Sequence, residues 1–163
     1  EMHRHMPIDI QLKHLVALDL IDDIIIANCY PSAAEKEALK HVCLDVVNFK
    51  VVLEANILET EKKIVLEELH LNRGDLNPCM IRSSQSRVKY RGHHFDVFHA
   101  PDMIHRGDVL IDSSEYGTYA GELQIALQDM KNSGRTNVVG HIREEELFIL
   151  DSLKPWQKFK FTL

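Results

Sequence analysis

Residues 108–127 have the sequence DVLIDSSEYGTYAGELQIAL. Two β-type runs, at 108–111 and 118–127, flank the turn-forming residues 112–117, which is a pattern typical of a β-hairpin. Further short β-type runs occur at 46–53, 64–70, 88–90, 137–142 and 158–163. This series, which starts near residue 44, predicts a small closed or half-closed β-barrel.

A predicted turn and a predicted helix separate the last of these β-type runs. Ser133-Gly134-Arg135 predicts a turn. Residues 144–153 begin with acidic residues, carry leucines at three-residue steps and are followed by Pro155. Acidic residues favour the first turn of a helix and proline cannot continue one, so this segment predicts a short helix.

The first 43 residues follow a different pattern, with helix and strand in alternation. Apolar residues recur at three- and four-residue steps over 8–20, which predicts a helix with one apolar face. Ile24–Ala27 is short and wholly apolar, as in a strand buried on both faces of a parallel sheet. Ser32 and Glu35 match a capping box, so a helix should run from there to about residue 42.

The α–β–α order of this first part is typical of α/β architecture. One buried strand makes no sheet, so its neighbouring strands should be missing or supplied by another chain. The sequence also begins with Glu1 and not with Met. We therefore expect an α+β, mainly β chain with two parts: residues 1–43 as a barrel remnant and 44–163 as the β-barrel domain. On this interpretation the chain is a fragment of a larger enzyme.

The composition argues against several classes of function. The formal net charge is -6, whereas a protein that holds nucleic-acid phosphates usually carries a basic surplus, so nucleic acid is not an expected partner. Cys29, Cys43 and Cys79 match no zinc or redox spacing, which favours three reduced thiols in a cytosolic protein. No signal peptide or membrane-spanning run is recognised. The histidine clusters lack companion ligands, and we expect neither a metal nor a cofactor.

The densest polar block is Ile81-Arg82-Ser83-Ser84-Gln85-Ser86-Arg87. Guanidinium forks match phosphate and carboxylate geometry, and serine hydroxyls add donors, so an anion site is one interpretation. The other is a solvated loop whose arginines pair with surface acids, and residue statistics favour this second interpretation.

Two further blocks can contribute polar groups. In Asn72-Arg73-Gly74-Asp75 a tight turn can project Arg73 and Asp75 together, or simply join them as a local pair. Tyr116, Tyr119, Glu122 and Gln124 can line a sugar site, although the tyrosines can equally pack with their hydroxyls at the surface. Glycoside hydrolysis normally needs two facing carboxylates, and nothing in the sequence places Asp75 opposite Glu122.

Five blocks together carry a family resemblance. They are NRGD at 72–75, IRSSQSR at 81–87, RGDVLID at 106–112, YGTYAGELQI at 116–125 and NVVG at 137–140. Their order and spacing over about residues 70–163 resemble the C-terminal region of the 6-phospho-N-acetylmuramidase family, whose members were long labelled outer surface proteins. Residues 1–43 are similar to the last barrel units of that family, with His3-Arg4 closing one strand and Ile24–Ala27 forming the eighth.

The resemblance implies an N-terminal (β/α)8 barrel, here truncated, and a C-terminal cyclophilin-like domain. It implies hydrolysis of the β-1,4 bond in a disaccharide bearing N-acetylmuramic acid 6-phosphate, during cytoplasmic recycling of cell-wall sugars. The catalytic carboxylates are expected on earlier barrel strands, so this chain alone should bind the phosphosugar without cleaving it. Ala27-Asn28 stands where the family's Gly-Asp is expected, which replaces an acidic group with a neutral amide.

The residues expected to bind substrate come from both parts of the chain. They are Arg4, Asn28, Asn72, Arg73, Asp75, Arg82, Ser86, Arg87, Tyr116, Tyr119 and Glu122. Two alternatives stay open beside the glycosidase fragment. One is a non-catalytic module that binds sugar or protein, and the other, suggested by topology alone, is a prolyl isomerase. The missing barrel segment or a second copy of the chain is the expected protein partner.

Overall fold

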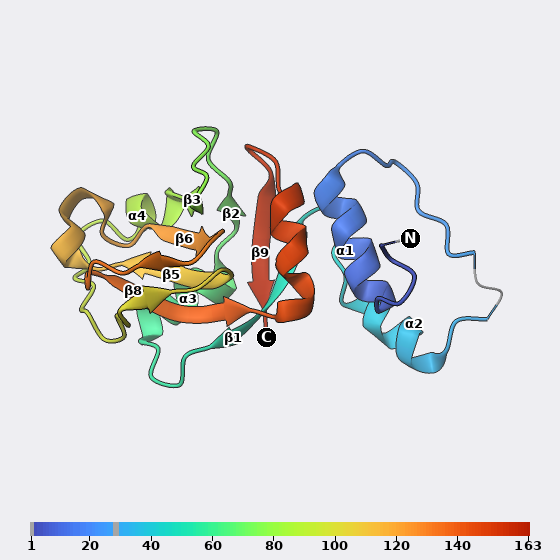
Figure 1. Ribbon diagram of the computed structural model, residues 1–163, viewed down its shortest axis with the longest axis horizontal. Coiled ribbons are helices and arrows are strands. Elements are labelled where there is room, and N and C mark those ends of the chain that lie inside the picture. Colours follow the sequence, from blue (N-terminus) through green and yellow to red (C-terminus); the bar gives the residue numbers. More distant parts are fainter. Residues whose placement is uncertain (1, 28–29) are drawn as a thin grey trace.

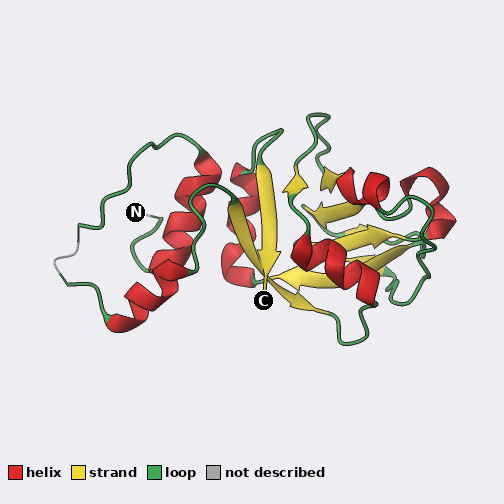
Figure 2. Ribbon diagram, turned by 180° about the vertical axis from the view of Figure 1, so that it is seen from behind, coloured by secondary structure: helices red, strands yellow, loops and turns green. Residues whose placement is uncertain are grey.

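The computed structural model describes residues 2–27 and 30–163. The fold is mixed α/β and mainly β, with a strongly curved seven-stranded sheet in one part and two helices beside it in the other (Figures 1 and 2). This confirms the mainly β class predicted for the chain. Among the described residues, no helix combines the length and the apolar character needed to cross a membrane.

The large sheet is nearly closed into a barrel. Its strands, in spatial order, are β2 (His70–Leu71), β9 (Lys158–Thr162), β1 (Val47–Leu53), β8 (Thr136–Ile142), β5 (Asp108–Asp112), β6 (Leu123–Ala126) and β3 (Met80–Ser83). β1 and β9 are parallel, and the other neighbours are antiparallel. The edges meet where the Arg73 N–H, just after β2, donates to the Arg82 carbonyl of β3 at 3.0 Å.

Short elements surround this sheet. A separate hairpin pairs β4 (Met103–Ile104) with β7 (Met130–Lys131). The helices are α1 (Ile8–Leu18), α2 (Ala33–Lys40), α3 (Glu59–Glu67), α4 (Gln85–Lys89) and the 3-10 segments η1 (Ser114–Tyr119) and η2 (Glu144–Ser152). One apolar core fills the barrel and includes Phe49, Phe159 and Phe161, all at most 2% exposed.

Helix α1 packs against η2, on the side of the sheet next to β9 (Figure 1). A buried ion pair joins them, because Lys13 Nζ lies 2.6 Å from Glu146 Oε1. The other Glu146 oxygen accepts a hydrogen bond from the Lys50 N–H of β1. The Gln157 side chain also donates to the last carbonyls of α1 at Val16 and Ala17. Polar contacts therefore attach the first part of the chain to the β-domain.

The predicted strand at Ile24–Ala27 is wrong. These residues form no strand in the structure, and the Ile25 side chain is 87% exposed. An apolar run forms a buried strand only when neighbouring strands bond its backbone, and the described residues supply none here. The capping box beside it is confirmed, because Ser32 and Glu35 exchange both expected hydrogen bonds at the start of α2.

Two other predicted strands are mostly helical. We expect a strand over 64–70, but 59–67 form α3, in which Glu61, Ile64 and Val65 share one buried face at helical spacing. Within the predicted range only His70 belongs to a strand, β2. Residues 88–90 fall at the end of α4. The run at 118–127 is a strand only at β6, because η1 extends through Tyr119.

The remaining strand predictions are confirmed. β1, β5, β8 and β9 lie at the expected positions, and β5 pairs with β6 as the hairpin predicted from residues 108–127. The helix expected at 144–153 is present as the 3-10 segment η2.

Candidate functional site

Strand register places a row of side chains, polar at Arg82 and Gln124 and apolar at Leu110, on the face of the sheet opposite the main core. Arg82 on β3 pairs with Gln124 on β6, which in turn pairs with Leu110 on β5. Side chains alternate between faces along a strand, so Ile81 and Ile125, one residue along, point into the core. The row leads to the polar ends of β5 and β8, where Asp112 pairs with Thr136.

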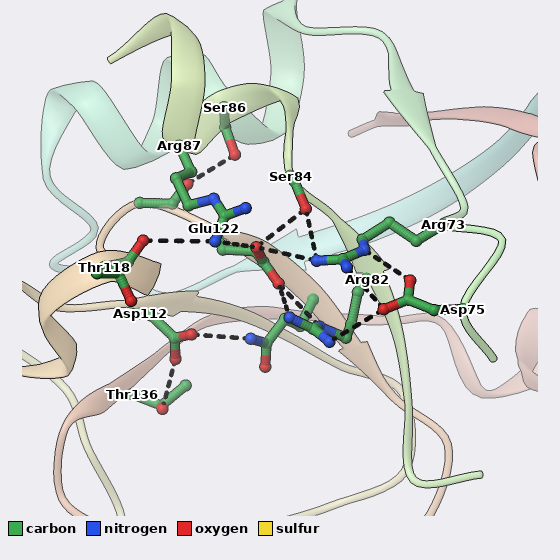
Figure 3. Close-up of polar contacts among 12 residues, drawn as sticks. Arg73, Asp75, Arg82, Ser84, Ser86, Arg87, Asp112, Thr118, Glu122 and Thr136 are labelled. Atoms are coloured by element: carbon green, nitrogen blue, oxygen red, sulfur yellow. Dashed lines mark hydrogen bonds and ion pairs between the residues drawn. The ribbon is translucent and has the colours of Figure 1, made fainter. Parts of the chain in front are cut away.

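Glu122 lies at the centre of a cluster of arginines (Figure 3). Its side chain has no exposed surface. Arg82 donates from Nε and Nη2 to Oε1, both at 2.8 Å, while Ser84 donates to Oε2 at 3.0 Å. Arg87 Nη1 and Arg73 Nη1 approach Oε2 at 3.3 and 3.8 Å. A buried carboxylate is stable only when it is paired, so Glu122 fixes the three guanidinium groups in place.

Asp75 contacts the same cluster from its solvent side. Its carboxylate accepts from Arg73 Nε and Nη2 at 2.7 and 2.6 Å, and Oδ2 lies 3.7 Å from Arg82 Nη1. The Arg73 guanidinium holds the pKa of Asp75 below its usual range. Three guanidinium groups against two carboxylates leave one surplus positive charge in the cluster.

Two tyrosines from η1 flank the arginines. The guanidinium carbons of Arg82 and Arg87 lie 5.5 and 5.3 Å from the centre of the Tyr119 ring, within cation–π distance. Tyr116 packs edge to face with Tyr119. The chain returns to β6 through Gly121, whose φ is 78° and where an added Cβ would lie 2.6 Å from the Phe95 ring. Only glycine fits that turn, which positions Tyr119 and Glu122 on either side of it.

A pocket of about 270 Å³ opens beside this cluster. Arg82, Tyr116 and Tyr119 contribute to its walls, and Lys131 of β7 adds a second cation. Its polar base is formed by three buried side chains, Asp112, Gln124 and Thr136. Burial raises the pKa of Asp112 to about 6, and the neighbouring Glu122 charge acts in the same direction.

The structure brings together most of the residues predicted for the site. Arg73, Asp75, Arg82, Arg87 and Glu122 form the charged cluster. Tyr116 and Tyr119 line the adjoining pocket. The predicted loop at 81–87 is in fact a strand followed by a helix, so its arginines are held by regular structure.

Three other predicted residues lie away from the charged cluster. The Asn72 amide donates to the carbonyls of Leu153 and Lys154, and the Ser86 hydroxyl donates to the Gly121 carbonyl at 2.6 Å. Both side chains are buried, and their contacts support the chain around the cluster. Arg4 lines a separate pocket beside α1, together with His3 and His14. Asn28 lies outside the described residues.

The sequence prediction named Gln124 as a possible sugar contact but missed the other two residues at the base of the pocket. Asp112 was assigned to a turn, and Thr136 was not singled out. A charged residue directly after the apolar run Val109–Ile111 was the available signal, but nothing local links it to a threonine 24 residues later. In the part of the chain that the structure describes, no three His, Cys, Asp or Glu side chains form a group suited to a metal ion.

Comparisons with known proteins give a consistent assignment. The family profile described as 6-phospho-N-acetylmuramidase, C-terminal, matches residues 47–162, and the N-terminal profile of the same family matches residues 1–41. No curated protein sequence matches this chain at a significant level.

Two solved structures are similar over nearly the whole chain. An uncharacterized protein from B. cereus is 42% identical with a TM-score of 0.93, and the match covers 100% of this chain and 47% of that one. A conserved protein of unknown function from Enterococcus faecalis is 22% identical with a TM-score of 0.68, covering 94% and 41%. The second likeness is one of fold alone. The chain thus spans less than half the length of either structure, and it belongs to the 6-phospho-N-acetylmuramidase family.

Proposed function

We propose that this chain is the part of a 6-phospho-N-acetylmuramidase that binds the phosphorylated muramic sugar. The carboxylates that cleave the β-1,4 bond would come from barrel strands outside these residues. On this proposal the isolated chain binds the phosphosugar but has no turnover. Since the sugar is an intermediate of cell-wall recycling, the proposal also assigns the protein to the cytoplasm.

The arginine cluster around Glu122 is the observation that carries this proposal. Arg73, Arg82 and Arg87 keep 18–29% of their side-chain surface exposed while Glu122 is fully buried. Each guanidinium is therefore held on one side by the protein and still reaches solvent, although Asp75 occupies two of the Arg73 donors. A phosphate monoester carries a charge near −2 and three acceptor oxygens, which match the surplus positive charge and the arginine donors.

The domain assignment extends the same proposal. Residues 1–43 would be the last units of a (β/α)8 barrel, and residues 44–163 a cyclophilin-like domain. The exposed isoleucines of 24–26 and the apolar side of α1 line a pocket of about 500 Å³. Further barrel strands packed against this surface would bury its apolar side chains. The match of residues 1–41 to the family's N-terminal profile supports this interpretation.

Titration calorimetry with N-acetylmuramic acid 6-phosphate and with unphosphorylated N-acetylmuramic acid tests the proposal. We expect binding of the phosphorylated sugar and a clear preference for it. Arg87→Ala should weaken binding of the phosphorylated sugar by at least about tenfold, because it removes a charge-assisted contact. Arg143→Ala is the control, since Arg143 is an exposed arginine next to η2 and outside the cluster.

Arg87 is preferred to Arg82 for this variant. Arg82 makes the two 2.8 Å contacts to Glu122, so its loss would leave a buried carboxylate poorly paired and would confuse stability with binding. Equal affinity of the wild-type chain for the two sugars would refute the proposal. So would an Arg87→Ala variant that discriminates between them as well as the wild type does.

A further inference from the structure

The base of the pocket beside Arg82 has no role in the anion binding proposed above. It consists of Asp112 at the end of β5, Gln124 on β6 and Thr136 at the start of β8. All three side chains are buried, with at most 7% of their surface exposed, yet all three line the pocket. Buried polar side chains at the bottom of an open pocket are typical of positions that fix a ligand's orientation.

Hydrogen bonding leaves Asp112 with unused acceptor capacity. Thr136 Oγ1 donates to Oδ1 at 2.7 Å, and Gln124 Nε2 donates to Oδ2 at 2.8 Å. These are its side-chain donors within residues 2–27 and 30–163, whereas a carboxylate offers about four acceptor positions. Because its amide nitrogen bonds Asp112, Gln124 keeps its own carbonyl oxygen as a further acceptor. The base therefore favours a ligand that donates hydrogen bonds.

Strand register fixes the distance between this base and the arginines. Arg82 and Gln124 are direct partners on neighbouring strands, which lie about 4.8 Å apart. A ligand whose anionic group pairs with Arg82 would thus extend its next ring atoms over Gln124 and Asp112. The pocket volume of about 270 Å³ lies at the small end of ligand sites, so it suits a single sugar ring better than a disaccharide.

We propose that Asp112 and Gln124 determine specificity for the sugar ring, by accepting hydrogen bonds from hydroxyl or amide N–H groups of one pyranose whose anionic substituent pairs with Arg82. This inference rests on the proposed phosphosugar binding. It adds that the ring itself is recognised, and that only one ring of the disaccharide enters this pocket. Tyr116 and Tyr119 supply the aromatic wall against which an apolar ring face can pack.

The test compares two ligands on the wild-type chain and on Asp112→Asn, by calorimetry at pH 7.5. The ligands are N-acetylmuramic acid 6-phosphate and inorganic phosphate. Asp112→Asn keeps the size of the side chain but removes its charge and one acceptor oxygen. We expect it to weaken binding of the sugar phosphate by about tenfold or more without weakening the binding of inorganic phosphate. Asp96→Asn, an exposed carboxylate paired with His94, is the matched control and should change neither affinity.

The outcomes separate the inference from the function on which it rests. If the wild-type chain does not bind the sugar phosphate, both fail. If it binds and Asp112→Asn binds it equally well, the inference alone is overturned. The same holds if Asp112→Asn loses affinity for both ligands equally, because Asp112 would then only support Arg82. Gln124→Met, which keeps the length of the side chain, gives a second measurement with the same expected pattern if Asp112→Asn does not fold.

Discussion

Asp75 is the most exposed member of the charged cluster. Its carboxylate is 54% exposed and binds Arg73 through two hydrogen bonds, on the side of the cluster that faces solvent. A ligand phosphate would need the same guanidinium donors. Asp75 therefore acts as an internal competitor, which satisfies Arg73 and approaches Arg82 while no ligand is bound.

We expect Asp75→Asn to tighten phosphate binding severalfold, because it removes this competing charge and raises the surplus positive charge of the cluster. Calorimetry with inorganic phosphate measures the change. Asp151→Asn is the control, since Asp151 forms a similarly exposed pair with Arg106 outside the cluster. A weaker affinity in Asp75→Asn would contradict this account and would mean that Asp75 orients Arg73 for the ligand.

At the scale of elements, attachment of α1 to η2 depends on a buried ion pair. Lys13 and Glu146 are 3% and 2% exposed and lie 2.6 Å apart. Lys13→Met should lower the free energy of unfolding by about 3–5 kcal/mol, because it leaves the Glu146 carboxylate buried without its cation. Urea unfolding followed by circular dichroism measures this loss.

Lys40→Met is the matched control for that experiment. Lys40 also lies 2.6 Å from its partner, Glu37, but both side chains are more than 60% exposed. Solvent screens such a pair, so the variant should unfold like the wild type. If the two variants lose equal stability, the contact between α1 and η2 does not depend on the buried pair.

Sequence patterns predicted the strands whose apolar residues and bounding turns are adjacent in the chain. β5 and β8 have apolar runs bounded by turn residues, so the sequence marks both their type and their ends. The run at Ile24–Ala27 carries the same signal, but a buried strand also needs partner strands, which local sequence does not show. Conversely, α3 was missed because Ile64, Val65 and Leu66 are adjacent apolar residues, and only Glu61 one turn earlier reveals the helical face.

In the candidate site, too, some features could be predicted from adjacent residues and others depend on strand pairing. Arg82 and Arg87 stand out in sequence because two arginines and three serines lie within one short block. Glu122 becomes their centre only when β3 pairs with β6, and Asp112 meets Thr136 only when β5 pairs with β8. Polar groups that are close in sequence could be predicted as a cluster. Contacts that depend on strand register could not be predicted.

At the scale of the whole molecule, two buried groups give opposite dependences of stability on pH. Burial raises the pKa of Asp112 to about 6, so the folded state keeps a proton that the unfolded state has released, and this group destabilises the fold as pH rises from about 4 to 6. Burial lowers the pKa of His70 to about 4, so this group stabilises the fold as pH rises from about 4 to 6.5.

Asp112→Asn removes the first contribution and leaves the second. We expect the stability of this variant, relative to wild type, to increase as pH rises from 4 to 6.5, by up to about 3 kcal/mol. Urea unfolding at a series of pH values measures the difference. A constant difference across this range would show that Asp112 titrates as it does in the unfolded chain.

The charged cluster and the pocket both lie on the β-domain, so the phosphorylated sugar should bind there. A crystal structure of the chain with N-acetylmuramic acid 6-phosphate would show where it binds. We expect phosphate oxygens within hydrogen-bond distance of Arg82 and Arg87, with the sugar ring above Gln124. Phosphate bound instead in the pocket of His3 and Arg4 beside α1, with the arginine cluster unchanged, would contradict this expectation.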